Sequence, residues 1–256
     1  MKVTLLGAHS SETTAARCMS ILIDGKLAID AGSLTSSLSL EEQKSLNTIL
    51  LTHAHFDHIM DIPLLALNSF RMNARIDIYA RPHVRAIIQD HLLNGHVYPR
   101  FQGLPAKKPT ISFRSITPLR RRQIAGYQVL AVPVNHVEGT VGYQVTDARG
   151  KCVFYTADTG PGLHECWKRV SPQLLIIETT MPNGQEDYAR RTGHLTPDLL
   201  LAELTDLWAV KGELPRIVVV HRDPLLEDEV VEGLAAVAKT LKTDITVAAE
   251  GMQLEL

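Results

Sequence analysis

A seven-residue segment rich in histidine constrains this chain more than any other feature of its sequence. Residues 52–58 are Thr-His-Ala-His-Phe-Asp-His, and they lie between a short apolar run and a segment with helical character. Residues two apart in an extended chain face the same way, so His53 and His55 can bind one ion together. A turn after them can direct Asp57 and His58 towards a second ion. Imidazole and carboxylate ligands suit zinc, with manganese and iron as alternatives.

Five apolar runs in the chain each lead to polar side chains that can bind a metal or carry a proton. The runs cover residues 48–51, 129–134, 152–155, 174–177 and 217–220. In the same order, they lead to His53 with His55, His136, Asp158, Glu178 and His221. We interpret the runs as buried strands. Strands that all end in this way place their functional groups along one edge of a sheet.

The remaining pattern indicates strands that alternate with helices. Further strands are predicted at 3–6, 20–23, 27–29 and 245–248, and helices at 61–69, 82–93, from Pro197 to near Gly212, and at 225–241. This mixture predicts an α/β architecture in which helices cover sheet faces. No linker or charge block divides the chain, and side chains from residue 53 to residue 221 must converge on one site. We therefore expect a single domain over residues 1–256.

The composition excludes several classes of protein. The chain has 26 basic and 28 acidic residues and a formal charge of −2, which disfavours nucleic-acid binding through a strongly basic surface. No apolar run approaches the roughly 20 residues of a membrane helix, and the N-terminal apolar stretch is too short for a signal peptide. The three cysteines show no CxxC spacing, which argues against a disulfide scaffold. We therefore expect a cytoplasmic protein without membrane contact.

The motif His53-x-His55-x-Asp57-His58 resembles the signature of the metallo-β-lactamase superfamily, which is HxHxDH at the end of a strand. The rest of that family's pattern follows in order along nearly the whole chain. Asp30, within Ala-Ile-Asp-Ala-Gly, is similar to the early aspartate that supports the metal loop. Three later residues are similar to the remaining ligands, namely His136, Asp158 and His221.

The resemblance implies two divalent metal ions, zinc before manganese or iron, and a particular distribution of ligands. One ion would take His53, His55 and His136. The other would take Asp57, His58, Asp158 and His221, with Asp158 bridging both ions. The resemblance also implies the metallo-β-lactamase fold, a four-layer αββα sandwich in which two mixed sheets pack face to face with helices outside.

Two further segments resemble the ribonuclease Z and class II cyclic-nucleotide phosphodiesterase branches of that superfamily. One is residues 136–143, a histidine with a downstream Gly-Tyr, and the other combines Glu178-Thr-Thr with Gly-His194-Leu-Thr-Pro. The resemblance implies that His194, paired with Glu178, handles the proton at the leaving oxygen of a phosphodiester. An alkoxide leaving group has a high proton affinity, so it benefits from a general acid. We therefore predict Glu178 and His194 as catalytic residues, together with Asp57, which is also a ligand.

Other branches of the superfamily fit less well. Flavodiiron oxidoreductases have Glu where this chain has His55, and glyoxalase-like thioesterases usually have Gly at the position of Asp61. The lactamase branches commonly place a cysteine late in the site, whereas Cys152 and Cys166 flank Asp158 without replacing it. These differences favour the phosphodiesterase-like branches.

The sequence favours a small substrate over RNA. His136 and Asp158 are only 22 positions apart, which leaves room for one tight hairpin but not for the long arm with which ribonuclease Z enzymes grip tRNA. We expect a dinuclear-metal phosphodiesterase that converts 3′,5′-cyclic nucleotides to 5′-nucleotides. The alternatives are tRNA 3′-end processing and a non-catalytic nucleotide-binding sensor on the same fold.

The expected partner is therefore a small-molecule phosphodiester, with nucleic acid as the less favoured alternative. The resemblance also suggests a homodimer, because relatives commonly pair. Three features have no role assigned by the sequence, namely His9, His164 and the basic run Arg120–Arg122.

Overall fold

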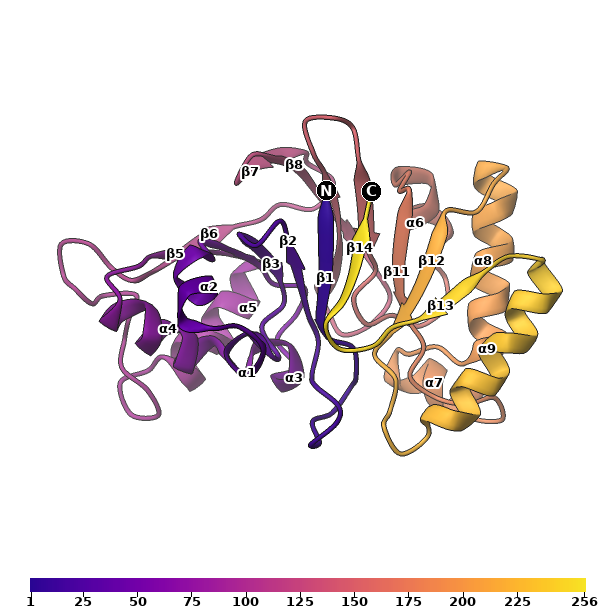
Figure 1. The fold of residues 1–256 in the computed structure, drawn as a ribbon, viewed down its shortest axis with the longest axis horizontal. Coiled ribbons are helices and arrows are strands. Elements are labelled where there is room, and N and C mark those ends of the chain that lie inside the picture. Colours follow the sequence, from indigo (N-terminus) through magenta and orange to yellow (C-terminus); the bar gives the residue numbers. More distant parts are fainter. The chain divides into compact units, whose positions relative to one another are not determined.

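The fourteen strands of the computed structural model, which describes residues 1–256, form two sheets of seven strands (Figure 1). Each sheet lies in its own compact unit of the chain. The first unit comprises residues 1–7, 17–117 and 250–255. The second unit comprises residues 8–16, 118–249 and 256.

The first sheet combines antiparallel and parallel pairing in the order β14-β1-β2-β3-β4-β5-β6. Its strands are β1 (Lys2–Gly7), β2 (Ser20–Ile23), β3 (Leu27–Ile29), β4 (Thr48–Leu50), β5 (Ile76–Ala80), β6 (Ile111–Ser115) and β14 (Met252–Glu255). Strands β14 to β3 pair antiparallel, and β3 to β6 pair parallel. Because β3 and β4 are parallel neighbours, Asp30 and the histidine-rich segment follow them at the same edge of the sheet.

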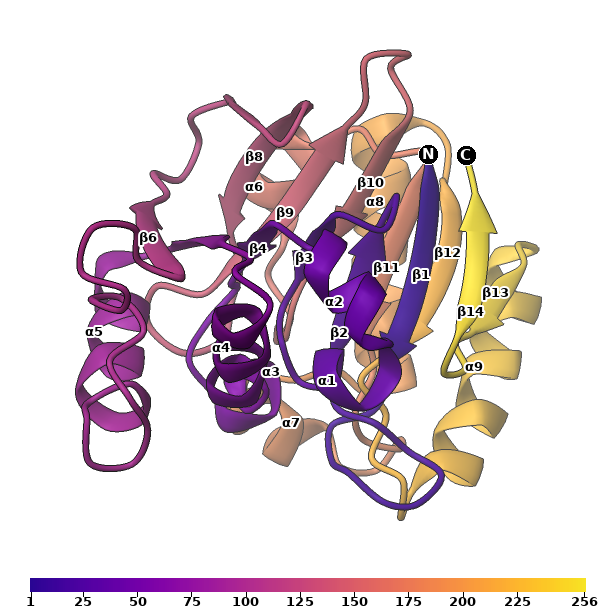
Figure 2. The ribbon, with the colours of Figure 1, turned by 60° about the vertical axis from the view of Figure 1, so that its left-hand side comes forward.

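Helices cover the first sheet, and Figure 2 shows α1, α2 and α4 lying over one of its faces. The helices of this unit are α1 (Leu34–Ser37), α2 (Leu40–Ser45), α3 (Phe56–Ile59), α4 (Ile62–Arg71) and α5 (Pro82–Ile87), which continues into the π-helical turn η1 (Ile88–Leu92). Leu22, Ile49 and Ile78 of the strands pack with Leu65 of α4 and Val84 of α5 in one apolar cluster. Burial of this cluster holds the helices on the sheet.

The second sheet has the order β13-β12-β11-β10-β9-β8-β7. Its strands are β7 (Arg122–Ile124), β8 (Tyr127–Pro133), β9 (Val141–Thr146), β10 (Cys152–Tyr155), β11 (Leu174–Glu178), β12 (Arg216–Val220) and β13 (Ile245–Val247). Strands β7 to β10 pair antiparallel, and β10 to β13 pair parallel. Strands β8, β10, β11 and β12 therefore run in the same direction, so their carboxyl ends lie at one edge.

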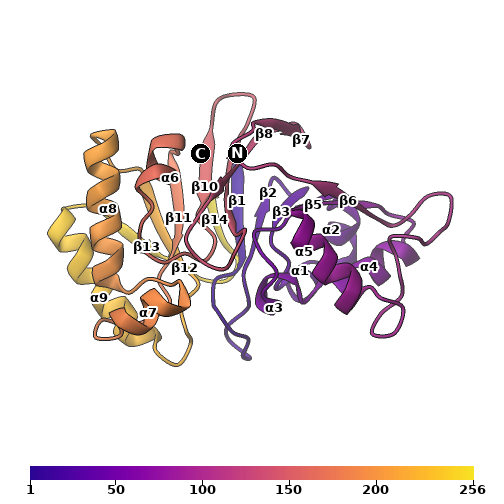
Figure 3. The same cartoon turned by 180° about the vertical axis from the view of Figure 1, so that it is seen from behind.

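The helices of the second unit are α6 (His164–Arg169), α7 (Glu186–Thr192), α8 (Pro197–Lys211) and α9 (Glu227–Leu241). Helix α8 begins after Thr196, whose hydroxyl accepts a backbone N–H of the first turn, and ends at Gly212 in the left-handed conformation. Figure 3 shows α8 and α9 side by side, and their Leu204 and Leu234 join strand side chains in one apolar cluster. None of the helices in the structure combines the length and the apolar character needed to cross a bilayer.

The predicted α/β class with two mixed sheets and helices is confirmed. One expectation about the strands was wrong, because the run 48–51 forms β4 of the first sheet while the other four runs form strands of the second. The five runs therefore do not share an edge of one sheet. An apolar run specifies a strand, but its partners depend on contacts that are distant in the sequence. The segment 82–93 is also not a single α-helix, because its second half is π-helical.

A buried carboxylate of α8 holds the segment that follows β10. Glu203 accepts hydrogen bonds from the backbone N–H groups of Gly162 (2.6 Å) and Leu163 (3.1 Å) and from the indole N–H of Trp167 (3.2 Å). These donors lie at the start of α6, where backbone N–H groups have no partner inside the helix. Glu203 therefore anchors α6 to α8.

We predict that Glu203→Gln lowers the free energy of unfolding by about 1–3 kcal/mol, because the NH2 that replaces one carboxylate oxygen would face a buried donor and cannot accept its hydrogen bond. Equilibrium urea unfolding followed by circular dichroism measures this change. The matched control is Glu213→Gln, at an exposed position, which should stay within about 0.5 kcal/mol of the parent. Equal stability of the E203Q variant and the parent would contradict the anchoring role.

Candidate functional site

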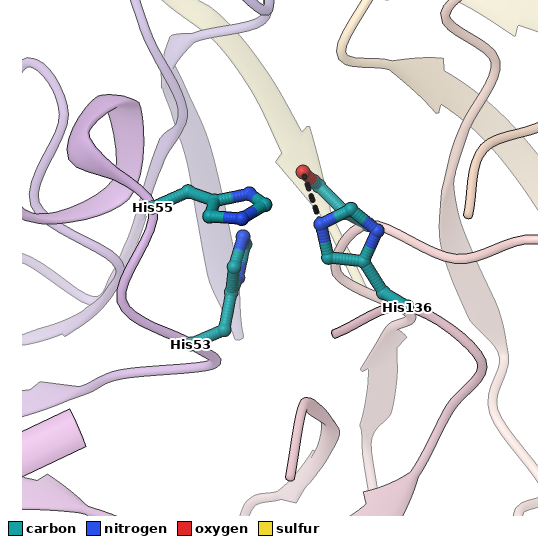
Figure 4. A group of neighbouring side chains, drawn as sticks. His53, His55 and His136 are labelled. Atoms are coloured by element: carbon teal, nitrogen blue, oxygen red, sulfur yellow. Dashed lines mark ion pairs between the residues drawn. The ribbon is translucent and has the colours of Figure 1, made fainter. Parts of the chain in front are cut away.

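The histidine-rich motif of the first unit lies between β4 and α3. His55 is the residue before the first turn of α3, and Asp57 and His58 belong to that helix. The ring of His53 lies 4.6 Å from that of His55 and 4.2 Å from that of His58, measured between ring centres. Figure 4 shows the His53 and His55 rings pointing toward one another. Strand, extended segment and helix thus bring all four side chains of the motif together.

Asp30 supports this motif from the end of β3. Its carboxylate accepts hydrogen bonds from His58 Nδ1 (2.7 Å) and from the backbone N–H (2.9 Å) and hydroxyl (2.9 Å) of Thr52. Complete burial raises the pKa of Asp30, although its contacts with His58 and Thr52 act in the opposite direction. The nearby Gly32 is required by close packing, since a Cβ there would clash with the carbonyl oxygen of Asp57.

The spacing of Asp57 and His58 is compatible with a shared ion. His58 Nε2 lies 3.2 Å from Asp57 Oδ2, while His58 Nδ1 is engaged by Asp30. Two ligand atoms bound at ~2.1 Å to one tetrahedral ion lie about 3.4 Å apart. The pair therefore has the separation that two ligands of one ion require.

In the second unit, His136, Asp158 and His221 follow β8, β10 and β12. The Nε2 atoms of His221 and His136 lie 3.3 Å and 3.8 Å from Asp158 Oδ2, and all three side chains are at most 3% exposed. Figure 4 marks the His136 ion pair with a dashed line. The parallel direction of the three strands brings the side chains together, as expected for the carboxyl ends of parallel strands.

The other ring nitrogen of these two histidines is held by protein oxygens. His136 Nδ1 lies 2.9 Å from the Gly193 carbonyl, and His221 Nδ1 lies 2.8 Å from the Thr180 hydroxyl. Gly193 has φ +74°, and a Cβ there would lie 2.7 Å from His136 Nδ1, so both the backbone and the space require glycine. Metal-binding histidines usually donate their second N–H to such partners. The donor set and its supports therefore fit divalent metal ions.

The predicted proton-handling pair also lies in the second unit. Glu178 ends β11, is fully buried, and accepts a hydrogen bond from His194 Nδ1 at 2.7 Å. The His194 side chain is 14% exposed, and its ring stacks on His221 with centres 5.5 Å apart. It also lies 4.9 Å from the ring of His136. The pair is thus adjacent to two of the predicted ligands.

Glu178, His194 and His221 also form a compact group of ligand-type atoms, all within 4.8 Å of one another. The facing atoms of this group already hydrogen-bond to each other or to the Thr180 hydroxyl. The proximity of the three side chains is therefore accounted for by hydrogen bonds alone. We assign no third ion to this group.

Several residues near the site were not assigned a role from sequence. Thr52, Thr180 and Gly193 each contact a predicted ligand histidine. Thr180 belongs to the Glu-Thr-Thr segment at residues 178–180, but the sequence does not indicate which side chain a threonine hydroxyl contacts. Asp61, which departs from the glyoxalase-like pattern, accepts the backbone N–H of Thr35 at 2.6 Å and so holds the start of α1.

The features left open by the sequence lie in different surroundings. His9 is buried, with Nε2 3.2 Å from Arg222 Nη2 and 3.3 Å from Glu227 Oε2. Burial opposes ionisation of Glu227, but its contacts with Arg222 and His9 together hold the pKa of that carboxyl below its usual value. His164 is exposed and pairs with Asp206 at 2.9 Å. The run Arg120–Arg122 is exposed.

The cysteines that flank Asp158 in sequence are core residues. Cys152 lies in β10, and Cys166 belongs to the apolar cluster with Trp167. Burial and the charge of nearby Glu203 raise the pKa of Cys166 to about 12. This thiol therefore stays protonated at neutral pH and behaves as a small apolar side chain.

Comparison with solved structures shows the same fold over the whole chain. Unliganded yeast PDE1 matches with a TM-score of 0.82 and 17% identity, covering 100% of this chain and 99% of that one. The metallo-β-lactamase fold protein YhfI from Bacillus subtilis matches with a TM-score of 0.77, 19% identity and the same coverage. The short form of human tRNase Z (ELAC1) matches with a TM-score of 0.71, 19% identity and the same coverage. No sequence among curated proteins matches.

The family described as the β-lactamase superfamily domain matches residues 20–221 of the chain. This range includes every predicted metal ligand, from His53 to His221. The expected resemblance to the metallo-β-lactamase superfamily is confirmed by the family match, and PDE1 and tRNase Z share the fold of this chain. The chain therefore belongs to the β-lactamase superfamily domain family and has the metallo-β-lactamase hydrolase fold.

Proposed function

We propose that the chain is a dinuclear-metal phosphodiesterase that hydrolyses 3′,5′-cyclic nucleotides to 5′-nucleotides. The observation that carries this proposal is the Glu178–His194 pair beside His136 and His221. A hydrolase that expels a poor leaving group needs a proton donor next to its metal ligands, and this pair provides one. The proposal treats residues 1–256 as one domain in which the ligands of both units act together.

In this proposal the residues that would hold one ion are His53, His55 and His136, and those that would hold the other are Asp57, His58, Asp158 and His221, with Asp158 a candidate ligand of both. Within each unit, the spacing of Asp57 with His58 (3.2 Å) and of Asp158 with His221 (3.3 Å) supports the assignment. Zinc suits this nitrogen-rich set. When bound, such ions activate water and neutralise charge on phosphoryl oxygens.

His194 acts on the leaving group. Glu178 accepts a hydrogen bond from Nδ1–H of His194. Nε2 is then the ring nitrogen that can deliver a proton to the substrate. The Glu178 carboxylate stabilises the protonated ring by charge and by hydrogen bonding. In a cyclic nucleotide, Nε2–H would protonate the ribose 3′ oxygen as the bond to phosphorus breaks. Asp57 completes the predicted catalytic set as a ligand beside His58.

A cyclic nucleotide is favoured over RNA by the segment between His136 and Asp158. The 21 residues between them are taken up mainly by the hairpin of β9 and β10, with no inserted arm. The near-neutral charge of −2 also offers no broad basic surface for a polyanion. Processing of tRNA is the second candidate, because human tRNase Z shares the fold. A non-catalytic sensor is less favoured, since every expected ligand position is occupied by a suitable residue.

Metal removal tests the reaction class. Treatment with a strong chelator should abolish hydrolysis of cyclic AMP, cyclic GMP and bis(p-nitrophenyl) phosphate, and zinc or manganese should restore it. Turnover is measured on these three compounds, on a precursor tRNA and on a glutathione thioester. Cleavage of the thioester without any phosphodiester turnover would contradict the proposal, and cleavage of the tRNA alone would favour the second candidate.

The general-acid role predicts a selective effect of His194→Ala. For cyclic AMP, kcat should fall by about 10²–10⁴-fold while metal content stays at the parent level. For bis(p-nitrophenyl) phosphate the loss should be smaller, because nitrophenolate leaves without needing a proton. The matched control is His164→Ala, at the exposed pair with Asp206, which should keep parent activity. A parallel fall of metal content and activity would show that His194 is not the general acid.

The contacts of Asp30 predict that Asp30→Asn weakens metal binding by about 10- to 100-fold, because His58 loses its charged partner. Metal affinity is measured by titration of the metal-free protein against a chromophoric chelator. Asp77→Asn, which removes a carboxylate paired with exposed Arg114, is the control and should bind metal as the parent does. Unchanged affinity in the D30N variant would remove Asp30 from the support of the site.

A further inference from the structure

Both units of the chain contain the same arrangement of one buried carboxylate, one threonine and two histidines. In the first unit, Asp30 lies 2.7 Å from His58 Nδ1 and 2.9 Å from the Thr52 hydroxyl. That hydroxyl also lies 2.9 Å from His53 Nδ1. All four side chains are fully buried. The carboxylate thus reaches one histidine directly and the other through threonine.

The second unit repeats the arrangement with different residues. Glu178 lies 2.7 Å from His194 Nδ1 and 2.9 Å from the Thr180 hydroxyl. That hydroxyl lies 2.8 Å from His221 Nδ1, and at a longer 3.4 Å from His194 Nδ1. Thr180 comes from the loop after β11, while His221 follows β12, its parallel neighbour. The two arrangements therefore arise from unrelated segments of sequence.

The donors around Glu178 determine which way the hydroxyl proton points. The backbone N–H groups of Thr159 and Leu195 can only donate, and they donate to Oε1 (3.0 Å) and Oε2 (3.2 Å). A carboxylate accepts at about four positions, and His194 and Thr180 fill the other two. Thr180 therefore donates its only proton to Glu178. Its oxygen then accepts from His221, so Nδ1 of His221 carries the hydrogen.

The same reasoning applies to Asp30. The backbone N–H of Thr52 donates to Oδ1 at 2.9 Å, and the Thr52 hydroxyl lies within 3.0 Å of both carboxylate oxygens. The backbone N–H of Thr52 and Nδ1 of His58 both donate to this carboxylate, and the Thr52 hydroxyl is the third donor to it. The threonine oxygen then accepts from His53, so Nδ1 of His53 carries the hydrogen.

We infer that Thr52 and Thr180 are positioning residues that hold His53 and His221 in the tautomer needed to bind metal through Nε2. Each hydroxyl links one buried carboxylate to a histidine that the carboxylate does not touch, and so fixes the tautomer and the orientation of that ring. The inference rests on the proposed function only in taking His53 and His221 as ligands. Because the two histidines are assigned to different ions, the two hydroxyls should act on different ions.

The test measures zinc affinity rather than turnover. Thr52→Val and Thr180→Val keep the shape of the side chain and remove its hydroxyl. In titrations of the metal-free full chain against a chromophoric chelator, each should weaken one of two zinc-binding steps by about 10- to 100-fold, and the two variants should weaken different steps. Thr52→Ser and Thr180→Ser restore the hydroxyl and should restore the affinity.

Thr179→Val is the matched control for this experiment. Thr179 is a buried neighbour of Thr180, but its hydroxyl donates to the backbone carbonyl of Glu178 at 2.7 Å. This variant should bind zinc as the parent does. Circular dichroism checks that each variant is folded. If a valine variant is not folded, Thr52→Ala or Thr180→Ala takes its place, and the same loss of zinc affinity is expected. In the cobalt-loaded protein, the visible absorption bands should change in the valine variants and return in the serine variants.

Three results would overturn the inference, namely parent-like zinc affinity in both valine variants, loss of the same step in both, or failure of serine to restore binding. A parent protein that binds two zinc ions but hydrolyses no phosphodiester would instead refute the proposed function and leave this inference intact. A parent that binds no zinc would refute both.

Discussion

A buried carboxylate with every oxygen engaged underlies each half of the candidate site. Glu178 accepts four hydrogen bonds, two from backbone N–H groups and two from side chains. Asp30 accepts from both the backbone and the side chain of Thr52 and from His58. A buried charge is tolerated only when such donors compensate it. The same hydrogen bonds hold the loops and orient the histidine rings. The interactions that compensate the buried charge therefore also order the site.

The backbone at these loops is held in a conformation that non-glycine residues rarely adopt. Asp30, Ala157 and His221 have φ values of 61°, 62° and 61°. Each of these residues follows or closely follows a strand end at which a predicted site residue lies. Such strain persists only where the surrounding structure determines the conformation. Here the hydrogen bonds of the carboxylates and the pairing of parallel strands supply that determination.

Much of the fold and site could be predicted because their signals are local. Short apolar runs predicted β2, β3 and β10 at their observed bounds, and Thr196 and Gly212 marked the ends of α8. The HxHxDH motif and its family resemblance identified the candidate ligands from the sequence alone. Strand partners could not be predicted in this way. The run 48–51 looks like the other four, yet it pairs with β3 and β5 in a different sheet.

The sequence by itself determined the chemistry available to this protein, because metal-binding and proton-handling groups are properties of residue type and of their order after apolar strands. Only the tertiary structure decided how those groups are oriented. Thr180 meets His221, 41 positions away, because β11 and β12 are parallel neighbours, and Thr52 meets Asp30, 22 positions away, because β3 and β4 are. The sequence does not indicate which groups a threonine hydroxyl will hydrogen-bond. Its role is determined by the strand pairing that places a carboxylate and a histidine beside it.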